Sequence, residues 1–111
     1  MKIFLISLVS LISFPTALHA ASMAKQKGYA AGAIGTNLCY LRKGMISKET
    51  FVLSVENLML RRGYDTDLLY KGNIKKAGRL IADKLGNNCN NQKIYDDKNF
   101  SEKILKILQV K

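Results

Sequence analysis

Three stretches of the sequence have apolar residues at helical spacing, and each stretch ends at a glycine: Gly44, Gly63 or Gly86. A glycine directly after the last apolar turn is typical of the C′ position of an α-helix. The first two stretches also carry basic residues just before the glycine, where positive charge favours a helix C-terminus. Since no stretch has the alternating pattern of a strand, we expect an all-α fold.

The first helix is predicted over residues 24–42, and the glycines within it lower its intrinsic propensity. Its apolar face consists of residues spaced by three or four positions: Ala30, Ile34, Leu38 and Leu41. Three glycines gather on one side of the same helix: Gly28, Gly32 and Gly35. We expect that side to let another helix approach closely.

The second helix is predicted to begin after Ser47, a good N-cap, with Glu49 in its first turn. Its expected apolar face comprises Phe51, Val55, Leu58 and Met59, with Val52 beside them. The Arg61-Arg62 pair lies in its last turn, and Gly63 ends it. These features give a helix of moderate length joined to the first by a short turn.

The third helix is predicted to start at a cap provided by Asp65 or Asp67 and to run to Leu85. Its expected buried stripe is Tyr70, Ile74, Ala77, Ile81 and Leu85. Because Gly72-Asn73 interrupts the pattern, this helix can also start late or bend there.

A short fourth helix is predicted to begin near Asn99, with Glu102 as its capping-box partner. Its expected buried face is Phe100, Ile104, Ile107 and Leu108. The resulting fold is a small bundle of three to four short helices.

The N-terminal segment, residues 1–20, has the pattern of a cleaved signal peptide. Lys2 precedes an apolar run, Pro15 interrupts it, and small residues follow around Ala20. The run is shorter than the roughly 20 apolar residues that a membrane span needs. We therefore expect export to the periplasm or beyond the cell, and a single domain over residues 21–111.

Cys39 and Cys89 are the only two cysteines, and in an exported chain they predict one structural disulfide. The chain-entropy estimate for a closed loop of this length is about 4 kcal/mol. A redox or metal pair is disfavoured, because the two residues are far apart in sequence and no C-x-x-C motif is present.

Histidine is almost absent: the chain contains one, His19, and cleavage of the signal peptide removes it. Catalytic triads, histidine general bases and histidine metal sites are then excluded from the exported protein. We predict no catalytic residues, no metal site and no cofactor. A hydrolase that uses two carboxylates, drawn from Glu56, Asp65 and Asp83, stays open as an alternative.

Basic residues outnumber acidic ones by 18 to 8, which gives a formal net charge of +10. In the third helix Lys71, Lys75 and Arg79 recur every four positions and share one face. Lys76, Arg61 and Arg62 are candidates to extend this anion-binding surface. The expected partners are lipid head groups, acidic polysaccharide or an acidic protein. Nucleic acid is disfavoured because the chain is predicted to be exported and carries no recognised DNA-binding motif. A solvated helix face without a partner is the plain alternative.

The segment from Gly35 to Gly44 has the pattern G-x-x-x-C-x-x-R-x-G, with Cys39 and Arg42 at the defined positions. With a second cysteine near the end, residues 35–89 resemble small exported two-cysteine proteins of unknown function from cyanobacteria. This resemblance implies a helical, disulfide-bonded domain and implies no activity. The layout, without a shared motif, is also similar to that of the periplasmic acid-stress chaperones.

These observations favour a non-enzymatic exported protein that binds an anionic partner at the cell envelope. A chaperone-like role is the alternative within the binding class, and the carboxylate hydrolase is the enzymatic alternative.

Overall fold

The computed structural model describes residues 15–110, with side chains from residue 23 on. All regular elements in that part of the chain are helical, and it contains no strand. They are α2 (Pro15–Arg42), α3 (Lys48–Arg61), the 3-10 helix η1 (Thr66–Tyr70), α4 (Gly72–Lys84), the 3-10 helix η2 (Gln92–Asp96) and α5 (Lys98–Ile107). The all-α prediction is confirmed.

The predicted signal peptide over residues 1–20 lies mostly outside the described residues, and α2 begins within it at Pro15. Export and cleavage therefore stay predictions. Within residues 15–110, no helix is both long enough and apolar enough to cross a membrane.

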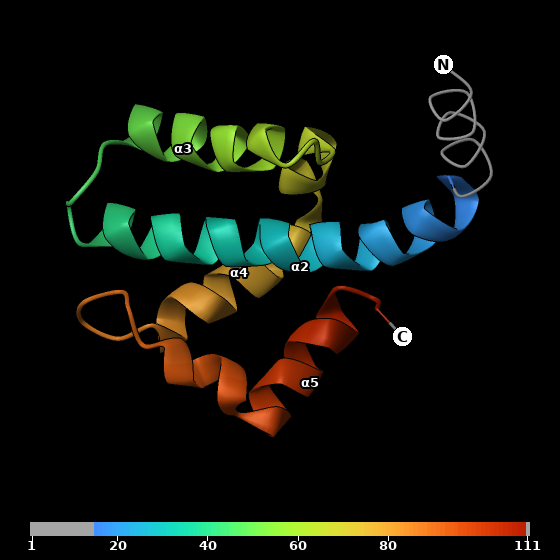
Figure 1. Ribbon diagram of the computed structural model, residues 1–111. Coiled ribbons are helices and arrows are strands. Elements are labelled where there is room, and N and C mark those ends of the chain that lie inside the picture. Colours follow the sequence, from blue (N-terminus) through green and yellow to red (C-terminus); the bar gives the residue numbers. More distant parts are fainter. Residues whose placement is uncertain (1–14, 111) are drawn as a thin grey trace, which may run out of the picture.

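Helix α2 is the longest element, and the others are arranged around it (Figure 1). Helix α3 folds back alongside α2, while α4 crosses on its other side and makes the most extensive contact with it. Helix α5 packs against α4. The largest fully buried side chains come from four different segments: Met59, Ile74, Leu85, Cys89 and Leu108.

The predicted glycine stops are confirmed. Gly44, Gly63 and Gly86 have φ of 73°, 69° and 81°, in the left-handed region that glycine enters without steric penalty. After α2, the N–H of Met45 donates to the carbonyl of Tyr40 at 2.9 Å, and Tyr64 repeats this bond to Met59 after α3 at 3.0 Å. Each bond closes a Schellman motif, so a helix carbonyl that would otherwise lack a partner is satisfied.

The third predicted helix begins later than its capping aspartates suggest. Asp65 does act as a cap, since its carboxylate accepts a hydrogen bond from the N–H of Asp67 at 3.0 Å. The element that it caps is η1, and extended backbone at Lys71 separates η1 from α4. Of the two starts that the sequence left open, the late one at Gly72 is therefore correct.

The late start also changes the predicted buried stripe. Ile74, Ala77, Ile81 and Leu85 are buried as expected, but Tyr70 is 60% exposed. The prediction for Tyr70 is wrong because η1 does not continue the helical register of α4.

The last helix starts one residue before the predicted position, at Lys98. Its N-cap is Asp97, whose carboxylate accepts a hydrogen bond from the N–H of Phe100 at 3.1 Å. A capping box from Asn99 to Glu102 is therefore wrong, because an aspartate two residues earlier already satisfies the first turn. Phe100, Ile104 and Leu108 are buried as predicted, while Ile107 is partly buried.

Glycines bring α2 and α4 into close contact. A Cβ atom added to Gly35 would lie 2.5 Å from Cγ2 of Ile81, and one added to Gly78 would lie 2.5 Å from Cγ2 of Ile34. Each glycine thus receives an isoleucine from the other helix. The predicted close approach is confirmed at Gly35, but Gly28 has no neighbour within 4 Å and does not take part.

The predicted disulfide joins Cys39 to Cys89, with a Cα–Cα distance of 5.7 Å. It connects the last turns of α2 to the loop that follows α4. Cys89 has a left-handed φ of 58°, which is unfavourable for a residue with a side chain. The bond therefore ties the loop after α4 to α2.

Candidate functional site

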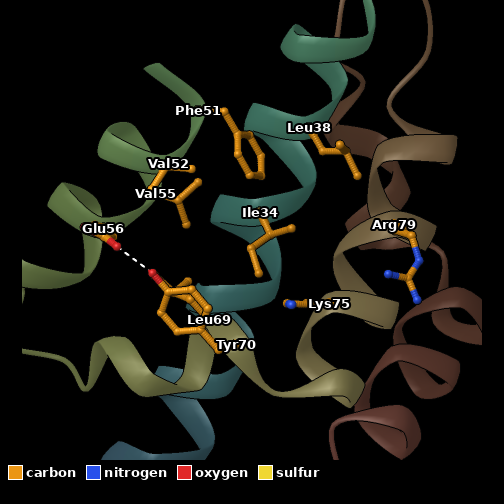
Figure 2. Close-up of a pocket in the computed structure, with 10 residues that line it drawn as sticks. All are labelled: Ile34, Leu38, Phe51, Val52, Val55, Glu56, Leu69, Tyr70, Lys75 and Arg79. Carbon is orange, nitrogen blue, oxygen red and sulfur yellow. Dashed lines mark hydrogen bonds between the residues drawn. The ribbon is translucent and has the colours of Figure 1, made fainter. Parts of the chain in front are cut away.

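A groove of about 340 Å³ lies over α2, between α3 and the segment formed by η1 and α4 (Figure 2). Its volume is at the lower end of the roughly 300–1,000 Å³ found for small-molecule sites. The lining residues are Ile34, Leu38, Phe51, Val52, Val55, Glu56, Leu69, Tyr70, Lys75 and Arg79.

The floor of the groove is apolar. Ile34, Val55 and Leu69 are buried, and Leu38 and Phe51 are partly buried. Val52 is 43% exposed on the α3 side. The groove therefore presents hydrocarbon to solvent over a hollow, which favours contact with an apolar group.

Two cations line the α4 side of the groove. Lys75 and Arg79 are one helical turn apart on α4, and both are exposed. Neither forms an ion pair with any residue that the structure describes. The Nζ atom of Lys75 lies 6.0 Å from the centre of the Tyr70 ring, at the limit of a cation–π contact. Their charge is therefore available to a negatively charged group at the groove.

The one acidic residue in the lining is engaged by a tyrosine. Tyr70 donates a hydrogen bond from its hydroxyl to Oε1 of Glu56 at 2.6 Å, across from Arg79 (Figure 2). This hydrogen bond, together with the negative charge of Glu56, raises the pKa of Tyr70 above its usual value. The carboxylate accepts this hydrogen bond and keeps its negative charge, so the groove has a positive side on α4 and a negatively charged residue on the α3 side.

Only two of the six predicted anion-binding residues line the groove. Lys75 and Arg79 line the groove, whereas Lys76 is the next residue along α4 after Lys75 and lies about 100° further around the helix. Lys71 is exposed at the cap position before α4, and Arg61 is exposed at the end of α3.

Arg62 lies beside a different hollow. Its guanidinium carbon is 4.3 Å from the centre of the Tyr29 ring, and Tyr64 packs edge-on against that ring. Tyr29 lines a second hollow, together with Gly32 and Tyr95, on another side of α2. Arg62 therefore belongs to an aromatic cluster and does not extend the basic side of the groove.

The three carboxylates of the hydrolase alternative have separate surroundings. Glu56 accepts from Tyr70, Asp65 caps η1, and Asp83 forms an ion pair with Arg42 on the surface. Each acid thus has a partner of its own. Among the described residues, no group of three or more histidine, cysteine, aspartate or glutamate side chains could hold a metal ion.

The groove itself was not predicted. Its polar residues Glu56 and Tyr70 come from two elements, and their contact depends on how η1 returns to α3. One signal was present in the sequence: Val52 lies beside the predicted apolar face of the second helix, so that this face is wider than a single buried stripe.

Comparison with known proteins gives no information on the role of the groove. The chain matches no family model, and no curated protein or solved structure is significantly similar to it. The resemblance of residues 35–89 to the cyanobacterial proteins therefore stays a prediction.

Proposed function

We propose that the protein is an exported, non-enzymatic binding protein, and that it holds an anionic partner of the cell envelope at Lys75 and Arg79. The observation that supports this most directly is the cation pair. Two positive side chains line one side of the groove and form no ion pair with any described residue, while the one carboxylate in the lining lies across the groove and accepts a hydrogen bond from Tyr70.

The electrostatic setting also favours an anion. The chain has a formal net charge of +10, so a negatively charged partner is attracted from a distance before it contacts the groove. Arginine and lysine one turn apart can both reach the same phosphate, sulfate or carboxylate group. Of the six predicted cations, the proposal assigns the contact to these two.

Binding to phosphatidylglycerol-containing vesicles tests this proposal. We expect affinity to fall steeply from low to physiological ionic strength, because exposed charges are screened. The double variant Lys75→Gln/Arg79→Gln is expected to lose about tenfold in affinity, or about 1.4 kcal/mol.

The matched control is Lys76→Gln/Lys103→Gln, which removes the same charge from exposed positions outside the groove. We expect less than a threefold loss for the control, which is less than about half of a tenfold step in free energy. Equal losses in both double variants would show that the charge acts diffusely and would remove the groove from the proposal. Binding that does not change with salt would remove the anionic partner.

A chaperone-like role is the second candidate. Three large apolar side chains are more than half exposed outside the groove: Met45, Leu53 and Leu60. Such residues can contact unfolded clients. Protection of an aggregating client at low pH would support this role, and its absence would dismiss it.

A further inference from the structure

We propose that the groove binds a free single-chain anionic amphiphile, with its hydrocarbon chain on the apolar floor and its negative head group at Lys75 and Arg79. This inference rests on the proposed function and specifies the chemistry of the partner. The class comprises fatty acids and alkyl phosphates or sulfates.

The groove is divided into an apolar part and a charged part. The floor is formed by Ile34, Val55 and Leu69, and none of these side chains can hydrogen bond to a ligand. The only positive groups are the two on α4. A polysaccharide or an acidic loop would satisfy the cations and leave the floor unused, whereas an amphiphile contacts both.

The negative charge in the lining lies on one side of the groove. Glu56 lies on α3, across the groove from the cations (Figure 2). An anionic head group placed on the α3 side would be repelled by that carboxylate, while one placed on the α4 side meets only positive charge. The electrostatics therefore set the direction in which an anionic amphiphile lies.

The volume of the groove fits a single hydrocarbon chain. At about 340 Å³, the groove is near the minimum for a small-molecule site, which suits one hydrocarbon chain better than the two chains of a bilayer lipid. The groove above this floor is also partly open to solvent, so that a flexible chain can enter without rearrangement of the helices. We therefore assign the apolar floor to the hydrocarbon chain of a free single-chain amphiphile, whereas a vesicle surface contacts Lys75 and Arg79 through its head groups alone.

Calorimetric titration with carboxylates of increasing chain length, all below their critical micelle concentrations, tests the inference. Each fully buried methylene group strengthens binding up to about fourfold. We expect dodecanoate to bind at least tenfold more tightly than octanoate, because part of the added chain stays in contact with solvent. Dodecanol, which has the same chain and no charge, is expected to bind at least tenfold more weakly than dodecanoate.

Two neighbouring variants on α3 separate the groove from general surface hydrophobicity. Val52 lines the groove, whereas Leu53 is exposed and does not. Val52→Ser is expected to weaken dodecanoate binding about threefold or more, on the scale of one to two methylene groups, and Leu53→Ser to leave it unchanged. Since both positions are on the surface, both variants are expected to fold.

The outcomes distinguish this inference from the proposed function. If octanoate and dodecanoate bind equally, or if Val52→Ser and Leu53→Ser weaken binding equally, the apolar floor does not contribute to binding. The proposal that the groove binds an amphiphile is then wrong. Salt-dependent binding to vesicles that Lys75→Gln/Arg79→Gln weakens would then still support the proposed function. If dodecanol binds as well as dodecanoate, the head-group assignment is wrong; if in addition the vesicles do not bind, both proposals fail.

Discussion

Helices α2 and α4 are in close contact at Gly35 and Gly78, where each glycine lies against an isoleucine of the other helix. Helices α3 and α4, in contrast, leave a groove between them over α2. Ile34 takes part in both regions: it contacts Gly78 on one side and lines the groove on the other. The close contact depends on residues that lack a side chain.

The groove, in contrast, is bordered by large side chains, including Phe51 and Tyr70. Large residues hold backbones apart, and where they do not fill the space between three elements they leave a hollow. The comparison indicates that the α2–α4 contact supports stability and that the groove is available for binding.

The largest expected effect concerns the disulfide, which reinforces the closely packed region. Cys39→Ala/Cys89→Ala is expected to lower the free energy of unfolding by about 4 kcal/mol, because the unfolded chain is freed from a closed loop. Urea unfolding followed by far-UV circular dichroism measures the loss. The reduced wild-type protein is the control and is expected to show a similar loss. A decrease below about 1 kcal/mol would mean that helix packing alone holds the loop after α4.

The second-largest expected effect concerns the contact between α2 and α4 at Gly35 and Gly78. Gly35→Ala and Gly78→Ala are each expected to destabilise the protein by about 1–3 kcal/mol, since a Cβ at either position meets an isoleucine within 3 Å. The matched control is Gly28→Ala in the same helix, where a Cβ has no neighbour within 4 Å. That variant is expected to gain up to about 1 kcal/mol from higher helix propensity. If Gly35→Ala were as stable as Gly28→Ala, the contrast between the contact and the groove would not hold.

The smallest effect concerns the groove and is electrostatic. The hydrogen bond to Glu56 and the charge of that residue raise the pKa of Tyr70, so the fold favours the protonated phenol. This contribution to stability is present below the unfolded pKa of about 10 and is lost as pH rises through the higher folded value. Ultraviolet titration of the phenolate absorbance measures the pKa values of the tyrosines. Glu56→Gln is expected to lower the pKa of Tyr70, and the titration step that is missing in Tyr70→Phe is the step of that residue.

Tyr95 provides an internal reference in the same titration. Burial raises its pKa, and it lines the second hollow away from Glu56. Its step is therefore expected to stay in place in both variants. A Glu56→Gln curve that superimposes on the wild-type curve would contradict the hydrogen bond across the groove.

Local sequence patterns predicted the helix ends well where an end depends only on nearby residues of the same helix. Gly44, Gly63 and Gly86 stop helices because a left-handed φ is a property of one residue and its immediate neighbours. The same holds for the apolar stripe from Ile74 to Leu85, whose residues repeat with the period of the helix.

Local patterns failed where two segments compete for the same residues. Tyr70 has the right spacing for the stripe of α4, but η1 turns it toward Glu56 on α3. Likewise, the sequence predicts Arg62 and Arg79 as parts of one anion-binding surface, but the structure places them beside different hollows along α2. Spacing within one helix says which residues share a face, and it does not say which other helix that face meets.

The sequence by itself determined that this protein is helical, where α2, α3 and α4 stop, that its two cysteines pair, and that Lys75 and Arg79 share a face. Each of these follows from short-range periodicity, single-residue conformational preference or residue count. Only the tertiary structure decided which glycines meet isoleucines, that Tyr70 is exposed, and that the two cations lie over an apolar groove. These features depend on how helices pack against each other, because a hollow between three elements is a property of their relative positions and not of any one of them.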